Sequence, residues 1–239
     1  MPPPDGPVVP YAGSLWRLIE EQSRPATMRL VDTDAEQAVL EDLLEESKPP
    51  VPEACRHLDY RLWSPFRYGR YPRSSRFRRA GPTPGVWYGS EHVTTALAEA
   101  VWGTLQFYSA STETPLPRRP VHRTAIEARV KAPLAVDLTE PGWAGRGRWD
   151  DPDYYSDCLA LAEQVRKEGV EAIRYRSVRD PEARANVAVL TCPAFEKPAP
   201  TASQSWQILF RPGLVRAYCE TTRSNHSYAV GDRTLTTPG

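Results

Sequence analysis

Hydrophobic residues repeat with the period of an α-helix in the middle of the chain. The residues of this repeat are three or four positions apart: Val93, Ala96, Leu97, Ala100, Val101 and Leu105. This spacing places them along one face, so it predicts an amphipathic helix. We expect Ser90 to cap the helix, because a serine hydroxyl accepts a free backbone N–H. Before it, Val86–Tyr88 and Ser75–Ala80 are predicted strands, joined by a turn rich in glycine and proline.

Similar patterns predict three further helices. Thr33 and Glu36 form a capping-box pair, which opens a helix with one apolar and one strongly acidic side. A second helix covers Tyr154–Glu168 and ends at Gly169, where a left-handed backbone suits glycine. A third, short helix is expected over Ser14–Glu21, because its leucine, tryptophan and isoleucine residues form an apolar side.

Alternating or short apolar runs predict the strands. They cover His122–Val130, Leu134–Leu138, Val170–Tyr175, Ala185–Leu190, Trp206–Phe210 and Leu214–Cys219. Strands and helices do not alternate regularly, which favours an α+β fold with small mixed or antiparallel sheets and flanking helices. Residues 1–60 are rich in proline and acidic side chains, so we expect a helical N-terminal extension before a main domain at residues 61–239.

Composition narrows the class of protein. Net charge is zero, which argues against a dedicated nucleic-acid binder. No apolar run approaches a membrane span of roughly 18 residues, and the first residues lack the regions of a signal peptide. We therefore expect a cytoplasmic protein with no membrane partner. Arginine supplies 26 of the 30 basic side chains, and its forked guanidinium suits phosphate recognition, although a GC-rich genome explains the same bias.

Several motifs of metal sites and enzymes are missing. Four cysteines show no CxxC spacing and four histidines are scattered without HExxH, so we expect reduced thiols and no metal. The absence of GxSxG argues against a nucleophile-elbow hydrolase. Neither GxGxxG nor a P-loop is present, so any nucleotide is held in another way.

Six arginines are interleaved with aromatic residues between Phe66 and Arg79. This mixture resembles surfaces that bind single-stranded nucleic acid. No RNP or KH pattern surrounds it, and a second interpretation pairs these arginines with the acidic helices. A third interpretation is a site for a small ligand that carries phosphate. The pattern by itself leaves all three open.

The polar residues with the most suggestive chemistry lie in and around the central helix. Six of them are candidates for a site: Arg76, Tyr88, Ser90, Glu99, Ser177 and Arg179. Taken singly, each has an ordinary explanation. Glu99 lies roughly 140° from the centre of the apolar stripe, which by itself predicts a solvated glutamate. Arg76 alone would be a surface arginine, and Ser177 a turn hydroxyl.

In combination, these residues resemble a known family. The order is SRFRRAG, VWYGS, TTALAE and, some 75 residues later, YRSVRDPEARANVAVL. This order resembles the RES domain, which is named for an arginine, a glutamate and a serine, and the resemblance spans roughly residues 61–210. It places the three on Arg76, Glu99 and Ser177. Family members often have proline before the serine, where this chain has Arg176.

The resemblance implies a toxin of a type II toxin–antitoxin pair, similar in fold to ADP-ribosyltransferase toxins. Its RES-like catalytic domain, residues 61–239, would act on NAD⁺ without a metal. ADP-ribose would pass to a protein target, to water or to phosphate. The implied partner is an antitoxin with an Xre-like helix-turn-helix domain, with no direct contact to nucleic acid. The alternatives are a nucleic-acid-binding module that uses residues 66–79, and a RES fold that serves only as a scaffold.

The residue types fit this implied chemistry. The Glu99 carboxylate would stabilise positive charge that develops on the ribose. Arg76 would fork onto the pyrophosphate, Tyr88 would stack on nicotinamide, and Ser177 would position ribose or amide. The expected NAD-binding residues are Arg76, Tyr88, Ser90 and Arg179. The segment 140–153, rich in glycine and tryptophan, is long enough to act as a lid.

Overall fold

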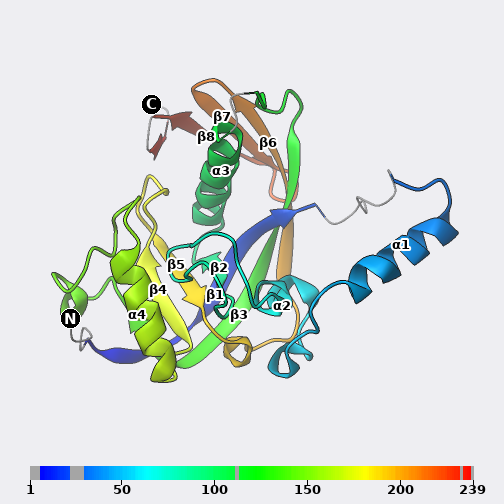
Figure 1. Ribbon diagram of the computed structural model, residues 1–239. Helices are drawn as coiled ribbons and strands as arrows, with labels where there is room; N and C mark the ends of the chain where they lie inside the picture. Colours follow the sequence, from blue (N-terminus) through cyan, green and yellow to red (C-terminus); the bar gives the residue numbers. More distant parts are fainter. Residues whose placement is uncertain (1–5, 22–29, 111–112, 232–233, 238–239) are drawn as a thin grey trace.

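One continuous sheet organises the molecule (Figure 1). The computed structural model describes residues 6–21, 30–110, 113–231 and 234–237. In space the strands run β1–β2–β5–β4–β3–β6–β7–β8–β9. Their bounds are β1 (Val8–Glu20), β2 (Trp87–Ser90), β3 (Val121–Asp137), β4 (Ala172–Arg176), β5 (Ala185–Val189), β6 (Ala202–Arg211), β7 (Leu214–Cys219), β8 (Ser224–Val230) and β9 (Leu235–Thr236). The fold is α+β, as the sequence predicted, but one large mixed sheet replaces the expected small ones.

β1 closes part of this sheet into a ring. It pairs antiparallel with β3 along its length, and it meets β2 on its other side where Trp16 faces Ser90. The ring therefore contains β1, β2, β5, β4 and β3. The helix expected over Ser14–Glu21 was wrong, because neighbouring apolar residues also fit a strand that packs on both faces. This strand lies within the segment that the sequence assigned to an N-terminal extension.

β3 is a single long strand and replaces two predicted ones, His122–Val130 and Leu134–Leu138. Its first half pairs with β6, and its second half runs parallel to β4. Pro133 lies near its middle, opposite the irregular step of β1 around Pro10. Proline has no N–H to offer a ladder, which explains the irregular pairing at this point. β3 thereby connects the ring to the antiparallel strands β6–β9.

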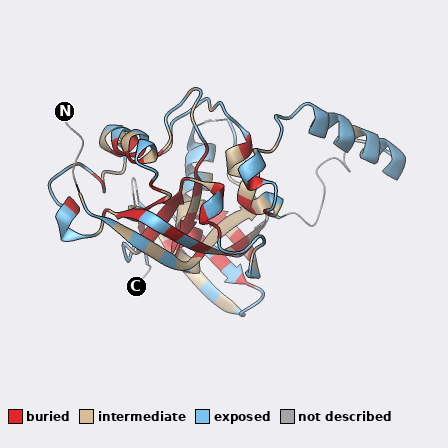
Figure 2. Ribbon diagram, turned by 90° about the horizontal axis from the view of Figure 1, so that it is seen from below, coloured by how far each residue is buried: buried red, intermediate tan, exposed pale blue. Residues whose placement is uncertain are grey.

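Four α-helices accompany the sheet in the described residues. They are α1 (Asp34–Glu46), α2 (Tyr60–Arg67), α3 (Val93–Ser109) and α4 (Ser156–Lys167). α4 lies over β4, while α1 projects away from the body and has no buried residue (Figures 1 and 2). The capping box of Thr33 and Glu36 confirms the predicted start of α1. Gly169 follows α4 with the expected left-handed backbone, at φ 79°.

α3 packs with its predicted apolar stripe against the C-terminal strands. Leu97 and Val101 are fully buried in a cluster with Trp206 and Phe210 of β6. Burial of this stripe fixes the rotation of the helix about its axis. The side of α3 that carries Glu99 is thereby turned away from β6.

The arginine-dense segment before β2 is irregular, so the strand expected over Ser75–Ala80 was wrong. An isolated bridge joins Ser75 to Arg78, and the Phe77 N–H donates to the hydroxyl of Tyr88 at 3.0 Å. The Phe77 ring is buried against Tyr175, with ring centres 4.9 Å apart. Side-chain anchors of this kind replace the ladder that a strand would have formed.

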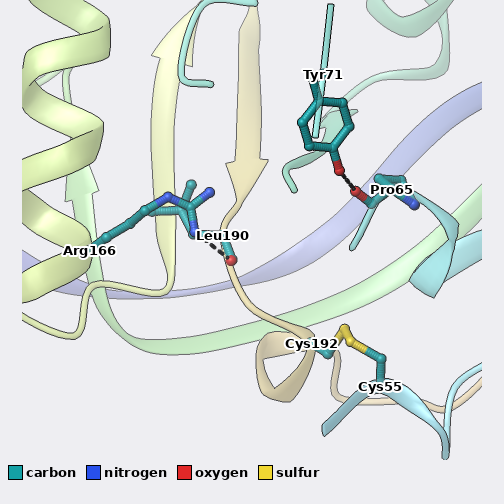
Figure 3. Close-up of a disulfide and its surroundings, with 6 residues drawn as sticks. All are labelled: Cys55, Pro65, Tyr71, Arg166, Leu190 and Cys192. Atoms are coloured by element: carbon teal, nitrogen blue, oxygen red, sulfur yellow. Dashed lines mark hydrogen bonds between the residues drawn. A yellow bond between two sulfur atoms is a disulfide. The ribbon is translucent and has the colours of Figure 1, made fainter. Parts of the chain in front are cut away.

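A disulfide joins Cys55 of the 3₁₀-helix η2 (Glu53–Cys55) to Cys192 of η4 (Cys192–Ala194) (Figure 3). The two cysteines are 137 residues apart in the sequence, with 5.2 Å between their Cα atoms. The expectation of reduced thiols was wrong for this pair, since distant cysteines give no spacing signal. The other two cysteines are free and buried: Cys158 and Cys219. The bond ties the segment before α2 to the chain that leaves β5.

Candidate active site

A cavity of about 460 Å³ opens between α3, β1, β2 and the loop that joins β4 to β5. Its wall brings together residues from distant parts of the chain, among them Arg17, Arg76, Tyr88, Ser90, Glu99, Tyr155, Tyr175, Arg179 and Asn186. Five of the six candidate residues from the sequence line this cavity. The sixth, Ser177, forms a hydrogen bond with Glu99.

Glu99 is held by two hydrogen bonds on one oxygen. Its Oε1 accepts the Ser177 hydroxyl at 2.7 Å and the Nδ2 of Asn186 at 2.7 Å. Its Oε2 accepts no hydrogen bond from the described residues. The helical pattern alone predicted a solvated glutamate, but Glu99 lines the cavity together with Ala96 and Ala100 at the edge of the apolar stripe. One carboxylate oxygen is therefore fixed and the other remains available.

Ser177 follows β4 directly and is 2% exposed. Its Oγ accepts the backbone N–H groups of Arg179 and Asp180, at 3.2 and 3.0 Å. A hydroxyl has one hydrogen to donate, so these two bonds leave that hydrogen directed at Glu99. Arg176, which stands where the family often has proline, is the exposed last residue of β4.

Asn186 and Ser90 support Glu99 from the opposite side. The two residues face each other in the β2–β5 pairing, and the Ser90 hydroxyl donates to Asn186 Oδ1 at 2.6 Å. This bond turns the Asn186 amide so that its N–H meets Glu99. The expectation that Ser90 caps α3 was wrong. The N-cap is His92, and its side chain forms no capping bond.

Arg76 lies buried between aromatic rings and backbone. Its Nη1 donates to the Trp149 carbonyl at 2.8 Å, and its guanidinium carbon is 4.7 Å from the centre of the Tyr155 ring. Burial lowers the pKa of Arg76, and the neighbouring Tyr175 and Cys158 more than restore it. The group stays a cation, and none of the described carboxylates forms an ion pair with it.

Arg179 closes the cavity from the β4–β5 loop. Its guanidinium carbon lies 4.4 Å from the centre of the Trp102 ring, and its Nη2 donates to the Pro152 carbonyl at 3.0 Å. Stacking on an aromatic face holds the Arg179 guanidinium in place.

Arg17 is a cavity residue that the sequence did not identify. It lies on β1, over the Trp87 ring at 5.5 Å, and its Nη1 is shielded from solvent without a hydrogen-bond partner among the described residues. Burial lowers its pKa to about 10, so it remains charged at neutral pH. A shielded N–H group without a hydrogen-bond partner is unfavourable for folding.

Three tyrosines supply the aromatic surface of the cavity. The Tyr88 hydroxyl is fixed by Ser75 at 2.9 Å, and Tyr155 stacks on Arg76. Burial raises the pKa of Tyr88. Burial also raises the pKa of Tyr175 well above its ordinary value, and the nearby Glu99 charge raises it further. The phenols of Tyr88 and Tyr175 are therefore neutral at physiological pH.

Comparison with protein families identifies the fold. The profile of the RES domain matches residues 50–211, about two thirds of the chain. The chain belongs to the RES domain family. This result confirms the resemblance found in the sequence motifs. The matched region includes Arg76, Glu99 and Ser177, while Arg17 lies before it.

The solved structures that are similar to this RES domain protein include a chain of a toxin–antitoxin complex. It belongs to the M. tuberculosis MbcT–MbcA toxin–antitoxin complex, with 13% sequence identity and a TM-score of 0.48. The similarity covers 82% of this chain and 85% of that chain. No curated protein matches the sequence.

The arginine-rich stretch 66–79 makes contacts within the RES domain protein itself. Arg67 forms an ion pair with Glu45 of α1 at 2.6 Å, and Arg79 pairs with Glu163 of α4. Arg78 stacks on Tyr71, 3.7 Å from its ring centre. These contacts confirm the interpretation that pairs the stretch with acidic helices. They leave fewer of its arginines for nucleic acid.

The segment 140–153 lies beside the cavity rather than far from it. It contains the 3₁₀-helix η3 (Pro141–Trp143), and the buried indoles of Trp143 and Trp149 pack edge to face. The Trp149 carbonyl binds Arg76. In the described residues there is no helix long and apolar enough to cross a membrane, and no group of three or more metal-ligating side chains.

The sequence did not identify four of the cavity residues named above: Arg17, Tyr155, Tyr175 and Asn186. Asn186 begins a buried apolar run, and a polar residue at the start of such a strand was a usable signal. Arg17 was missed because its segment was assigned to a helix outside the main domain. Leu15, Arg17 and Ile19 stand at every second position. In a strand this spacing places the arginine on the same face as the two apolar residues.

Proposed function

We propose that this RES domain protein is a toxin that cleaves NAD⁺ between nicotinamide and ribose, with a fold related to ADP-ribosyltransferase toxins. The position of Glu99 carries the proposal. Its carboxylate faces a cavity that three arginines also line, and its Oε2 accepts no hydrogen bond from the part of the chain that the structure describes. A fixed carboxylate of this kind stabilises the oxocarbenium-like charge that forms on a sugar when its glycosidic bond breaks.

The arginines fit the pyrophosphate of NAD⁺. Arg17, Arg76 and Arg179 line the cavity, and guanidinium forks match phosphate oxygens. Arg17 has the strongest need for such a partner, because its buried Nη1 has none among the described residues. A diphosphate carries two negative charges, so it balances this cluster better than a neutral ligand does.

The reaction follows from these positions. The C1′–N bond breaks, its electron pair moves to the ring nitrogen, and nicotinamide leaves as a neutral molecule. Positive charge appears on the ribose at that moment, so Glu99 binds the transition state more tightly than the substrate. An oxygen of the acceptor then bonds to C1′ and releases its proton. Ser177 and Asn186 keep Glu99 in the orientation that this step needs.

The tyrosines complete the binding of the substrate. Tyr88 presents a ring face for nicotinamide, and its hydroxyl is already held by Ser75 and Phe77. Because these bonds fix the ring before substrate arrives, little side-chain freedom is lost on binding. Ser90 acts through Asn186.

Release of nicotinamide from NAD⁺ by the purified protein tests the proposal. Replacing Glu99 by Gln keeps the size of the side chain and removes its charge, so turnover falls on the order of 10²–10³-fold. Glu163→Gln, at an exposed position of α4, is the matched control and keeps the wild-type rate. Equal rates for Glu99→Gln and wild type would remove Glu99 from the mechanism.

The acceptor of ADP-ribose is a protein side chain, water or phosphate. Labelled NAD⁺ in a cell lysate separates these cases. A labelled protein band shows transfer to protein, free ADP-ribose shows hydrolysis, and a phosphorylated product shows transfer to phosphate.

Toxicity and its control are further parts of the proposal. The protein arrests growth when expressed alone, and a neighbouring gene encodes a helix-turn-helix antitoxin that binds it and restores growth. If the protein is only a scaffold without activity, Glu99→Gln arrests growth to the same extent as wild type. If the protein is instead a nucleic-acid-binding module, its affinity for nucleic acid falls steeply as the salt concentration rises. The same affinity is unchanged in Glu99→Gln.

A further inference from the structure

The loop between β4 and β5 positions Ser177, and its polar residues are buried although it is a loop. Ser177, Arg179 and Asp180 are 2%, 5% and 6% exposed. Loops are usually the most mobile part of a fold. A mobile loop would not keep Ser177 Oγ within 2.7 Å of Glu99 on α3. The contacts between this loop and α3 therefore decide the geometry of the site.

The carboxylate of Asp180 provides those contacts. Its Oδ2 accepts the Thr95 hydroxyl at 2.7 Å and Arg184 Nε at 2.7 Å. Its Oδ1 accepts Arg184 Nη2 at 2.9 Å and the Glu182 N–H at 3.3 Å. The backbone N–H of Asp180 donates to Ser177 Oγ at 3.0 Å. One residue thus bonds to both Ser177 and α3.

Asp180 is ionised in this environment. Burial alone raises the pKa of Asp180, but the hydrogen bonds from Arg184 and Thr95 outweigh burial and lower it below its usual value. Hydrogen bonds to a charged group are stronger than those between neutral groups. The carboxylate therefore keeps its bonds at neutral pH.

Thr95 is the partner of Asp180 on the helix. It is fully buried and stands one helical turn before Glu99. Residues four apart lie on the same face of a helix, so a contact to Thr95 determines where the loop lies relative to Glu99. Neither Thr95 nor Asp180 lines the cavity.

We propose that Thr95 and Asp180 form a latch that fixes the position of Ser177 relative to Glu99. Both are positioning residues for the cleavage of NAD⁺, and the inference rests on that proposed function. Loss of the Thr95 bond leaves Asp180 paired with Arg184, so the loop keeps its own structure. It loses its buried bond to α3, while the Ser177–Glu99 bond and the stacking of Arg179 on Trp102 still join it to that helix. Small displacements of a catalytic group lower the rate more than they weaken substrate binding.

A pair of substitutions at Thr95 tests the latch. Thr95→Val keeps the shape and removes the hydroxyl, while Thr95→Ser keeps the hydroxyl. We expect Thr95→Val to lower kcat roughly tenfold with KM changed less than about twofold, and Thr95→Ser to stay near wild type. Thr104→Val is the matched control on α3, because the Thr104 hydroxyl donates only to the Ala100 carbonyl.

A second measurement does not depend on activity. The N–H groups of Arg179 and Asp180 donate to Ser177 Oγ, so their hydrogen exchange, followed by NMR, reports how firmly the loop is held. We expect both to exchange roughly tenfold faster in Thr95→Val and at the wild-type rate in Thr95→Ser. Asp180→Asn repeats the test from the loop side if Thr95→Val does not fold.

The outcomes separate the latch from the proposed function. Wild-type exchange in both Thr95→Val and Asp180→Asn overturns the latch, whatever the activity. Equal losses in Thr95→Ser and Thr95→Val also overturn it, because the hydroxyl would then play no part. A wild-type protein that leaves NAD⁺ intact ends the proposed function, and the exchange rates still decide whether the latch exists.

Discussion

Asn186 donates its Nδ2 hydrogen to Glu99 Oε1 across 2.7 Å, although 87 residues separate the two in sequence. Its Oδ1 accepts the buried Ser90 hydroxyl at 2.6 Å. A serine hydroxyl that donates to one end of an amide leaves the N–H end to face the other way. The pairing of β2 with β5 therefore sets which group meets the carboxylate.

Replacing Asn186 by Ala removes one of two donors to Glu99. We expect nicotinamide release at saturating NAD⁺ to fall between roughly tenfold and a hundredfold, because the carboxylate loses part of its orientation. Ser90→Ala leaves the Asn186 donor in place and has a smaller effect, below about tenfold. A wild-type rate in Asn186→Ala would show that Ser177 alone orients Glu99.

The parts of the fold that the sequence predicted correctly are governed by local rules. The capping box of Thr33 and Glu36 starts α1, and the apolar stripe from Val93 defines α3. β1 was taken for a helix because its apolar residues satisfy both periods over such a short length. Its identity as a strand depends on β3, which is more than a hundred residues away. Local patterns contain no information on such a partner.

The residues of the site also divide into those that sequence motifs identify and those that only the fold brings together. Arg76, Glu99 and Ser177 were found through sequence motifs that the family shares, and helical periodicity alone would have left Glu99 in solvent. Arg17 enters the cavity only because β1 closes the ring. The disulfide is a similar case, since its two cysteines are brought together by the fold and by no pattern of spacing.

The substitution Arg17→Met is expected to weaken NAD⁺ binding while it raises the stability of the protein. The guanidinium is partly buried, and its shielded Nη1 has no hydrogen-bond partner among the described residues, so its replacement by an apolar chain of similar length stabilises the protein. We expect a higher Tm, with about 2–4 °C for each kcal/mol gained, and a KM for NAD⁺ raised roughly tenfold. Arg129→Met on β3, which loses a surface pair with Glu196, changes neither by much.

The same residue predicts a pH dependence. The pKa of Arg17 is about 10 in the folded protein and higher in the unfolded chain. Below pH 10 Arg17 is protonated in both the folded and the unfolded state, so folding includes the full free-energy cost of desolvating its charge. Between these pKa values the unfolded chain binds more protons, so stability rises with pH. The stability gain of Arg17→Met, measured by urea unfolding, is therefore largest near pH 7 and shrinks above pH 10. A gain that grows above pH 10 contradicts this assignment.

α1 contributes little to the stability of the body. Val39 and Leu43 are each 59% exposed, and no residue of the helix is buried. We expect Val39→Ser and Leu43→Ser to change the free energy of unfolding by no more than about 0.5 kcal/mol. Leu97→Ala on α3, which is fully buried, costs about 2–5 kcal/mol in the same urea titration. A loss above about 1 kcal/mol for Leu43→Ser would mean that α1 docks on the body.

The Cys55–Cys192 disulfide is expected to stabilise the fold without affecting the reaction. It closes a loop of 137 residues, and the chain-entropy relation gives at most about 5 kcal/mol for a loop of this length. Neither cysteine lines the cavity. Cys55→Ser should therefore lower the free energy of unfolding and leave nicotinamide release unchanged at 25 °C. Cys219→Ser, at a buried thiol outside the bond, is the control for loss of a sulfur atom.

Reductant provides the decisive comparison for this bond. If the disulfide acts as a cross-link, reduction lowers the stability of wild type to that of Cys55→Ser and has no effect on the variant. In a reducing compartment Cys55 and Cys192 stay as free thiols, so protein made under oxidising conditions is the more stable form. Mass spectrometry under non-reducing conditions shows the bond directly as a loss of two hydrogens. The contrary result is a wild-type protein that shows this mass shift but has the same free energy of unfolding with and without reductant. The disulfide would then not stabilise the protein by restricting its unfolded chain.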